Sequence, residues 1–438
     1  MVGGCLVRYL HRWLSGISDV LFVEVLGLSF YVLLHALYNI RLVGLDHYTV
    51  SPSTIIIINH KRDLDFPLIT PILHVRKTFF RPRVRPCLVA RDDMFEAGYF
   101  TSHSPSNLPF GRLLHHWNPA PILRPLPTYP ISYVVRKPLR ALLYEVINME
   151  GNLQLKNVIK ADQLQRFTQI LDLPAEFDLG SLSLRDLLGY DYRALHELPT
   201  DVGILHGELP RKVRMHSIQM VDRQLHVFAH VLDDGGTCLM APEGNLWPDG
   251  HFWPVKIGLY RLLSMTKADA KILPVNITYD FMTQGRMHSY ITLGEEILGA
   301  RELPRVKLET LVQRKLVGLG PVTMGQLGSN YIVETLRASK ERFQKHELAE
   351  HLLSRMVEMK QAGLRLADSL ANRPLFQRRL NHFLQYCTDR LILTEGSPDI
   401  YVIQREKVLG RTGANYLQNP VQYSYNELCS LREVYADL

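Results

Sequence analysis

The pattern of apolar and polar residues near the N-terminus predicts a long helix. Residues 20–40 are largely apolar and, as an α-helix, would be roughly 31 Å long, close to a bilayer core. Glu24, His35 and Asn39 fall within about 60° of one another on a helical wheel. One narrow polar stripe favours embedding in one leaflet, or packing against the protein body, over a lipid-exposed span. A buried helix of a soluble protein is the alternative, and the absence of a small-x-small site disfavours a cleaved signal peptide.

A second apolar run, Ile55–Ile58, consists of four β-branched residues and predicts a fully buried strand. His60 follows where the chain leaves this strand. Asp63 is a predicted N-cap, and the helix that it begins should reach about Leu73. A histidine at a strand end can meet a carboxylate at the start of the next helix, which makes His60 and Asp65 a candidate general base with its orienting acid. A plain polar connection is the alternative.

Other short apolar runs predict four more strands, at residues 87–90, 120–124, 237–241 and 271–279. Pro274 indicates an edge position or an irregularity in the last of them. Residues 133–230 read as a mainly helical insertion, residues 331–393 as charged helices, and residues 400–403 as a possible strand.

These elements place the chain in the α/β class, as a sheet flanked by helices. We expect an N-terminal membrane-associated helical segment at 1–42, a central domain at 43–300 that contains the insertion, and a mostly helical C-terminal extension at 301–438.

Composition agrees with a folded protein of a reducing compartment. Hydrophobic residues make up 46% of the 438 residues and charged residues 21%, enough apolar material for a sizeable core. The net charge of +7 fits an anionic membrane surface or phosphorylated substrates as well as nucleic acid. The five cysteines are scattered and form no C-x-x-C, which argues against a disulfide framework and a zinc ribbon.

A basic cluster interleaved with aromatic residues follows the first predicted helix: Arg76, Lys77, Arg81, Arg83 and Arg85, with Phe79 and Phe80. Such a cluster could hold phosphate groups or acidic lipid near an active centre. A solvated charged surface is the alternative.

Two common enzyme motifs are missing. The chain has no G-x-S-x-G, and so no nucleophile elbow of a serine hydrolase. Gly318-Leu319-Gly320 lacks the spacing of a dinucleotide-binding loop.

Polar residues stand at the predicted ends of three strands: His60 with Asp65, Arg124, and Glu243-Gly244. Ligand sites of α/β sheets gather at the carboxyl ends of strands, so we expect these residues to lie together. In this order they resemble the motifs of the glycerolipid acyltransferase family that includes the lysophosphatidic acid acyltransferases, over roughly residues 30–295.

The resemblance rests on four motifs. They are Asn59-His60-Lys61-Arg62-Asp63-Leu64-Asp65 for His-x4-Asp, Pro109 to Arg124 for the second motif, Pro242-Glu243-Gly244-Asn245 with the later Lys256-Ile257-Gly258 for the third, and Leu273-Pro274-Val275 for the fourth. The resemblance implies an acyltransferase-type mixed sheet, catalysis by His60 and Asp65, and a phosphate contact from Arg124. It also implies that Glu243, Gly244, Asn245 and Lys256 bind substrate.

The chain departs from the family pattern in two places. Asn118-Pro119 replaces the glycine that usually begins the second motif, and Asn245, Leu246 and Trp247 stand where the third motif usually has an arginine. Both places are where family members recognise the acceptor. The chemistry therefore carries over more safely than the identity of the acceptor.

The resemblance implies transfer of a fatty acyl group to a hydroxyl of a glycerolipid such as lysophosphatidic acid, in phospholipid biosynthesis. The donor would be acyl-CoA or an acylated acyl carrier protein, with no metal and no cofactor. Membrane lipid is the expected partner rather than nucleic acid, at the cytoplasmic face of a membrane (the inner membrane if bacterial). Glycerol-3-phosphate, an amine or sugar lipid as acceptor, or a non-catalytic membrane scaffold, are the alternatives.

Overall fold

The computed structural model describes residues 3–48, 51–62, 64–81, 85–102, 110–118, 126, 128–132, 136–174, 176–244, 249–409 and 418–436. The chain forms two compact units. Residues 1–85 and 231–438 form unit 1, and residues 86–230 form unit 2. The C-terminal segment from residue 301 therefore belongs to the same unit as the isoleucine strand.

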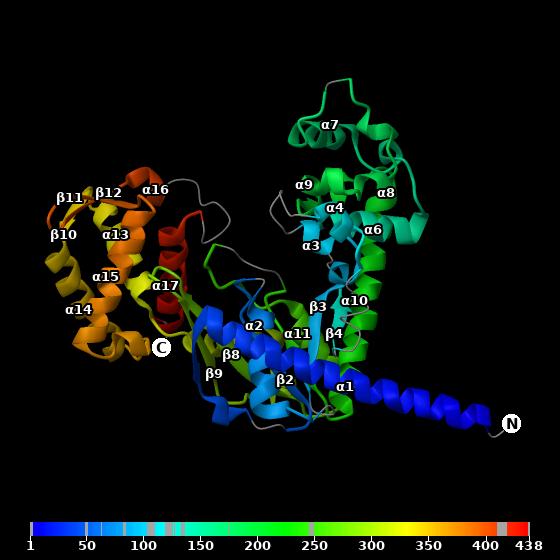
Figure 1. Ribbon diagram of the computed structural model, residues 1–438, viewed down its shortest axis with the longest axis horizontal. Helices are drawn as coiled ribbons and strands as arrows, with labels where there is room; N and C mark the ends of the chain where they lie inside the picture. Colours follow the sequence, from blue (N-terminus) through cyan, green and yellow to red (C-terminus); the bar gives the residue numbers. More distant parts are fainter. Residues whose placement is uncertain are drawn as a thin grey trace. The chain divides into compact units, whose positions relative to one another are not determined.

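Five strands of unit 1 form a mixed sheet (Figure 1). Their order is β1 (Tyr38–Val43), β9 (Met287–Leu293), β8 (Lys271–Asp280), β2 (Thr54–Ile58) and β7 (Thr237–Met240). Strand β2 is parallel to both of its neighbours, β8 and β7, whereas β9 is antiparallel to β8. The α/β class and the mixed sheet predicted from the sequence are thus confirmed.

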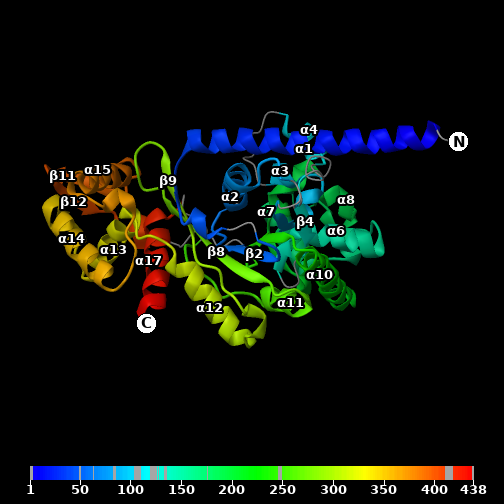
Figure 2. The ribbon, with the colours of Figure 1, turned by 90° about the horizontal axis from the view of Figure 1, so that it is seen from below.

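Helices cover both faces of this sheet (Figure 2). Helices α1 (Gly3–Leu37) and α2 (Asp65–Leu73) lie on one face, and α11 (Ile257–Met265) and α12 (Arg305–Gly318) lie on the other. A short π-helix, η2 (His74–Thr78), continues α2. This layering explains why Ile55 to Ile58 are fully buried, since both faces of β2 are covered and both of its edges are paired.

The local prediction around β2 is confirmed in outline. The strand ends at Ile58 and helix α2 ends at Leu73. The N-cap of α2 is Leu64, which makes no side-chain hydrogen bond to the helix. Asp63, the predicted cap, lies outside the described residues.

Pro274 does not lie in an edge strand, so that part of its prediction was wrong. Strand β8 lies between β9 and β2, and Pro274 is opposite Ile57 in the register with β2. The irregularity is real: pairing with β9 stops at Val275, and the Gly294 amide donates to the Pro274 carbonyl. The proline nitrogen therefore falls in a gap of the ladder, where no donor is needed.

Helix α1 begins at Gly3, before the predicted apolar run, and ends three residues earlier than predicted, because β1 begins at Tyr38 and Asn39 pairs with β9. Its segment Val20–Leu37 is long and apolar enough to cross a membrane by length and composition alone, and only 17% of it is buried. Within this apolar segment Glu24 is buried. Its carboxylate accepts from His74 Nε2 (3.0 Å), from the Phe80 amide (2.9 Å) and from the Arg85 guanidinium. Burial lowers the pKa of His74 despite the neighbouring carboxylate.

The C-terminal extension is mostly helical, as predicted. Besides α12, its longer helices are α13 (Met324–Arg337), α14 (Lys345–Gln361), α15 (Arg373–Asp389) and α17 (Pro420–Ala436). The predicted strand at 400–403 is β12, which pairs with β10 (Arg342–Gln344) and β11 (Leu393–Ser397). A buried ion pair between Arg379 of α15 and Asp280 of β8 (2.5 Å) joins this region to the main sheet.

Unit 2 contains the predicted insertion and has its own hydrophobic core. Parallel strands β3 (Cys87–Arg91) and β4 (Thr128–Ile131) precede the insertion. Its longer helices are α6 (Leu139–Glu150), α7 (Ala161–Ile170) and α10 (Leu209–Asp233), the last of which runs on into unit 1. Leucine and valine side chains between residues 139 and 213 form a buried cluster. Strand β3, predicted at residues 87–90, is only partly buried, and the predicted strand at 120–124 lies outside the described residues.

We predict that Gly27→Ala destabilises the protein. A Cβ at Gly27 would lie 2.4 Å from Cδ2 of His74, and this imidazole is held in place by Glu24. The clash should lower the free energy of unfolding by about 1–3 kcal/mol in thermal or denaturant unfolding. Gly258→Ala in α11 is the matched control, because nothing lies within 4 Å of its added methyl. Equal effects of the two substitutions would contradict close docking of α1 on His74.

Candidate functional site

The structure brings His60 and Asp65 together at the carboxyl end of β2. The Nδ1 atom of His60 lies 3.2 Å from Oδ2 of Asp65, and the imidazole remains partly exposed while the carboxylate is fully buried. A proton on Nδ1 donates to Asp65, which leaves the lone pair of Nε2 free to accept a proton from another molecule. This is the arrangement of a general base with its orienting carboxylate.

Asp65 is the most heavily hydrogen-bonded group of the site. Its Oδ2 also accepts from the backbone amides of Lys61 (2.6 Å) and Arg62 (2.8 Å), so the loop between β2 and α2 closes around the carboxylate. Its Oδ1 accepts from the Tyr279 hydroxyl (2.6 Å). Burial, reinforced by the nearby Asp65 charge, raises the pKa of Tyr279 well above its usual value. The phenol therefore stays a hydrogen-bond donor, and four donors compensate the buried carboxylate.

Asn59 explains why the chain turns where it does. Its side chain donates to the Ile277 carbonyl (2.9 Å) and accepts from the Ile277 amide (2.6 Å). The amide side chain thus replaces one step of backbone pairing with β8, while the backbone itself leaves the sheet. His60 is consequently placed at the rim rather than in the ladder.

Glu243 lies beside this pair and is itself buried. Burial raises the pKa of Glu243 to about 8; the Lys61 cation lowers it and the Asp65 charge raises it. The backbone amides of His60 and Trp253 also favour the charged carboxylate. The third predicted strand end, after β7, therefore meets the first one at a single place, as expected for neighbouring parallel strands.

Gly244 and Lys256 lie next to Glu243. Gly244 has a φ of +72°, a conformation that favours glycine, and a Cβ there would lie 3.2 Å from Cγ of Lys256. The Lys256 amide donates to the Pro242 carbonyl (2.8 Å) at the start of α11, and its side chain is exposed. Arg124 and Asn245 lie outside the described residues. Within the described part of the chain, no group of three or more His, Cys, Asp or Glu residues could hold a metal ion.

Lys61, inside the histidine motif, is buried and forms an ion pair with Glu427 of α17 (2.5 Å). Its ammonium also lies 4.2 Å from the centre of the Phe252 ring. The other oxygen of Glu427 accepts from Gln326 of α13 (3.2 Å). The C-terminal extension therefore contacts the loop that carries His60.

Sequence reasoning missed Tyr279, Lys61 and Glu427 as parts of the site. Tyr279 could have been found, because it stands near the carboxyl end of a predicted strand, as His60 does. Nothing near Glu427 in the sequence indicates its partner, which lies 366 positions away.

The comparisons with known proteins add no assignment: no protein-family model matches the chain, and no curated protein is significantly similar to it.

We predict that Glu243→Gln changes how stability depends on pH. A carboxyl whose pKa rises from 4.5 in the unfolded chain to about 8 in the folded protein takes up protons on folding. As the pH rises from about 4.5 to about 8, the free energy of unfolding of the wild type should therefore fall relative to that of the variant, by up to about 1.4 kcal/mol per pH unit. Denaturant unfolding across this range measures the difference. Exposed Glu302→Gln is the control, and a pH-independent difference for Glu243→Gln would contradict the raised pKa.

We further predict strong coupling between Lys61 and Glu427. Lys61→Met or Glu427→Leu alone leaves a buried charge without its partner and should lower the free energy of unfolding by about 3–5 kcal/mol. The double substitution should lose much less than the sum, measured as a double-mutant cycle. The more exposed Arg305–Glu309 pair is the control, with an expected coupling below about 1 kcal/mol. Additive losses at Lys61 and Glu427 would show that the buried contact does not form.

Proposed function

We propose that this protein is an acyltransferase that moves a fatty acyl group from an acyl thioester to a hydroxyl of a glycerolipid acceptor. The observation that carries the proposal is the His60–Asp65 pair, with the carboxylate buried under four donors and one imidazole nitrogen left free. The resemblance of its motifs to the glycerolipid acyltransferases supports the same reaction.

The reaction needs one base and no protein nucleophile. Nε2 of His60 takes the proton of the acceptor hydroxyl as the oxygen attacks the thioester carbonyl. Asp65 stabilises the imidazolium that forms and keeps Nδ1 protonated. The tetrahedral intermediate then collapses, the carbon–sulfur bond breaks, and the leaving thiolate takes the proton from Nε2. This sequence returns His60 to its starting state.

We assign the neighbouring groups to binding of the acceptor rather than to proton transfer. Glu243 is the second carboxyl at this rim, and its raised pKa keeps much of it protonated near neutral pH, so that it can donate to an acceptor oxygen or accept from a hydroxyl. Lys256 is an exposed cation next to Gly244, and its charge supports a role in binding a phosphate. Arg124 is the other proposed phosphate contact. A membrane lipid acceptor agrees with an apolar helix α1 in the same unit.

We predict that His60→Ala lowers turnover by roughly 10²- to 10⁴-fold, the usual contribution of a general base. The assay uses membranes enriched in the full chain, with labelled acyl-CoA or acylated carrier protein, against lyso-phospholipids, glycerol-3-phosphate, and amine and sugar lipids. The panel also separates the proposed acceptor from its alternatives.

The matched control is His47→Ala, whose imidazole contacts the Leu293 carbonyl near the opposite end of the sheet. This variant should keep most of the activity. Near-normal turnover by folded His60→Ala protein would remove the mechanism. No transfer by the wild-type chain from either donor to any acceptor would favour a non-catalytic membrane role.

A further inference from the structure

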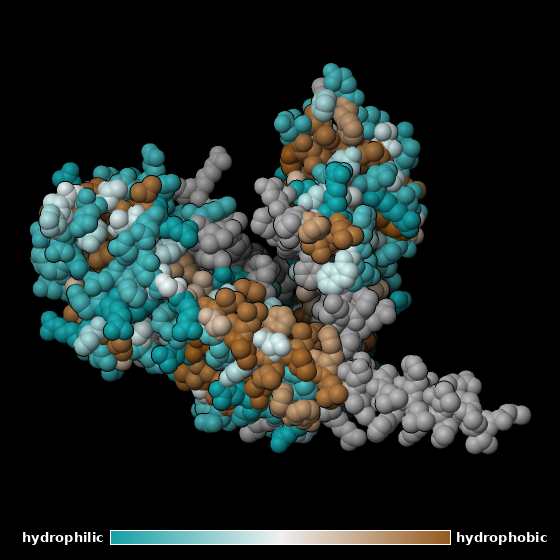
Figure 3. Space-filling view, viewed as in Figure 1, coloured by the Kyte–Doolittle hydropathy of each residue, from teal (hydrophilic) through white to brown (hydrophobic). Residues whose placement is uncertain are grey.

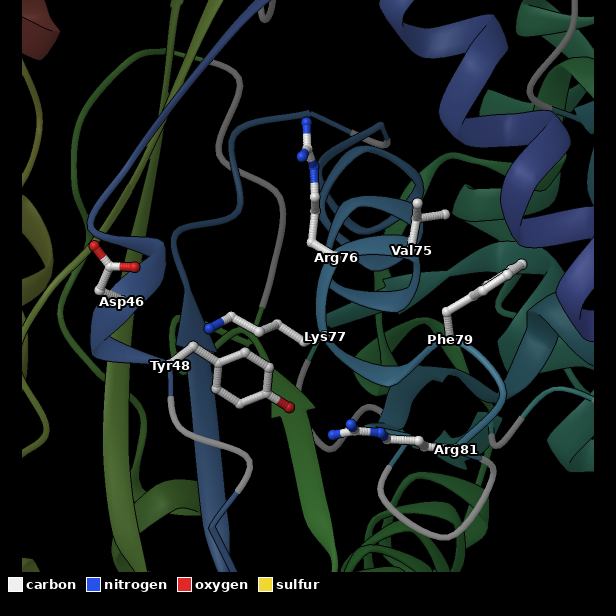
Figure 4. Close-up of a pocket in the computed structure, with 7 residues that line it drawn as sticks. All are labelled: Asp46, Tyr48, Val75, Arg76, Lys77, Phe79 and Arg81. Atoms are coloured by element: carbon white, nitrogen blue, oxygen red, sulfur yellow. The ribbon is translucent and has the colours of Figure 1, made fainter.

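A pocket of about 640 Å³ lies in unit 1 (Figure 4). It is lined by Arg76 and Lys77 of η2, by Arg81, and by Asp46 and Tyr48 from the turn that follows β1. Figure 4 shows Lys77 and Arg81 extending from their two segments toward the side occupied by Tyr48.

The pocket is at the opposite end of strand β2 from the candidate catalytic pair. Tyr48 precedes β2, whereas His60 follows it. The five residues of β2 separate its two ends by roughly 16 Å, since a strand rises about 3.3 Å per residue. The basic residues of η2 therefore do not belong to the His60 site, contrary to one expectation from the sequence.

The charge of this pocket is positive and uncompensated. Three cations face one carboxylate, Asp46, which leaves a net charge of +2 (3 − 1). Among the described residues, Arg76, Lys77 and Arg81 form no ion pair. Arg76 and Lys77 instead lie near the rings of Tyr31 (5.7 Å) and Tyr48 (6.0 Å). Such cations remain free to bind an anion.

Tyr48 provides a polar group in the wall of the pocket. Its residue is 1% exposed, yet its hydroxyl makes no hydrogen bond of ordinary geometry within the described structure. Burial raises the pKa of Tyr48 to about 12, and a side-chain hydrogen-bonding contact with Thr237 lowers it only in part. Because the contact with Thr237 lacks ordinary hydrogen-bond geometry, a ligand oxygen that accepts from the Tyr48 hydroxyl would gain a stronger hydrogen bond.

The surface next to the pocket is apolar. Phe79 and Phe80 follow η2 directly and are 36% and 61% exposed. Helix α1, which contacts α2 and η2, exposes large apolar side chains along Leu21–Leu37 while only a narrow side, with Val23, Glu24 and Leu34, is buried. Figure 3 shows a hydrophobic region where this part of α1 lies. An exposed apolar surface bordered by cations is typical of a membrane-binding face.

We propose that the pocket binds the phosphate of an anionic phospholipid headgroup while α1, Phe79 and Phe80 enter the apolar part of the same leaflet. Arg76, Lys77 and Arg81 supply the charge, and Tyr48 donates to a phosphate oxygen. Glu24 is held by His74, Phe80 and Arg85, so α1 stays against the protein body and lies along the membrane rather than across it. This site is separate from the proposed acyl transfer and does not depend on it.

The experiment measures binding of the full chain to vesicles by co-sedimentation. The vesicles are phosphatidylcholine alone, or a mixture in which roughly one lipid in three is phosphatidylglycerol. The test variant is Arg76→Gln/Lys77→Gln/Arg81→Gln. Lys340→Gln/Arg342→Gln/Lys360→Gln removes the same charge from exposed positions elsewhere in unit 1. Tyr48→Phe removes the hydroxyl without changing charge.

We expect phosphatidylglycerol to increase the affinity of the wild-type chain for vesicles. In the pocket triple variant this increase in affinity should be smaller by a factor of at least about 10. The control triple should keep the gain, and Tyr48→Phe should lose about 10-fold of it, the contribution of a hydrogen bond to a charged group. Binding to phosphatidylcholine alone should stay unchanged in all three, since it depends on α1 and the phenylalanines.

Four results would overturn the assignment. An equal loss in both triple variants, or no loss in Tyr48→Phe, would mean diffuse attraction rather than a pocket. No loss in the pocket triple would place the anionic lipid elsewhere. Competition by millimolar inorganic phosphate that removes the whole gain would assign the pocket to free phosphate instead of a lipid headgroup. Thermal unfolding and turnover at His60, measured in parallel, show whether each variant is folded independently of its lipid binding.

Discussion

The buried carboxylate of Asp65 is the group on which the architecture of the candidate site depends. A charge in the interior is tolerated only when donors surround it, and here the donors come from three places: the His60 ring, the loop amides of Lys61 and Arg62, and Tyr279 of β8. The loop between β2 and α2 closes around Oδ2 of this carboxylate. The same carboxylate therefore shapes the backbone, orients the imidazole and joins two neighbouring strands.

Other buried carboxylates of unit 1 attach the two ends of the chain to the sheet domain in the same way. Glu24 holds α1 against His74 and Arg85, and Glu427 holds α17 against Lys61. Asp280 at the end of β8 pairs with Arg379 of α15. The C-terminal region is thus part of the structure that supports the candidate catalytic loop. Loss of the Lys61–Glu427 or the Asp280–Arg379 ion pair would therefore disturb that loop.

Unit 2 attaches its insertion to the segment that resembles the second motif. His115 of the short helix α4 (Gly111–His115) accepts from Thr101 and donates to the Leu188 carbonyl, while Arg112 pairs with Asp191. Burial lowers the pKa of His115, so the ring is neutral and can both donate and accept. The insertion therefore supports α4, which precedes the proposed phosphate-binding residue Arg124 in the chain.

Local pattern alone determined the secondary structure around β2, the class of the fold and the candidate pair His60 and Asp65. These follow from β-branched runs, helix periodicity and polar residues at strand ends, all of which act over a few residues. The end of α1, the central place of β8 despite Pro274, and the partners of Lys61 and Glu24 were not predictable in this way. Each depends on which strand or helix pairs with which, and on buried charges that must find partners far away in the sequence. Tertiary structure also separated the basic residues of η2 from the His60 site, because α2 carries the chain from the carboxyl end of β2 back to its amino end.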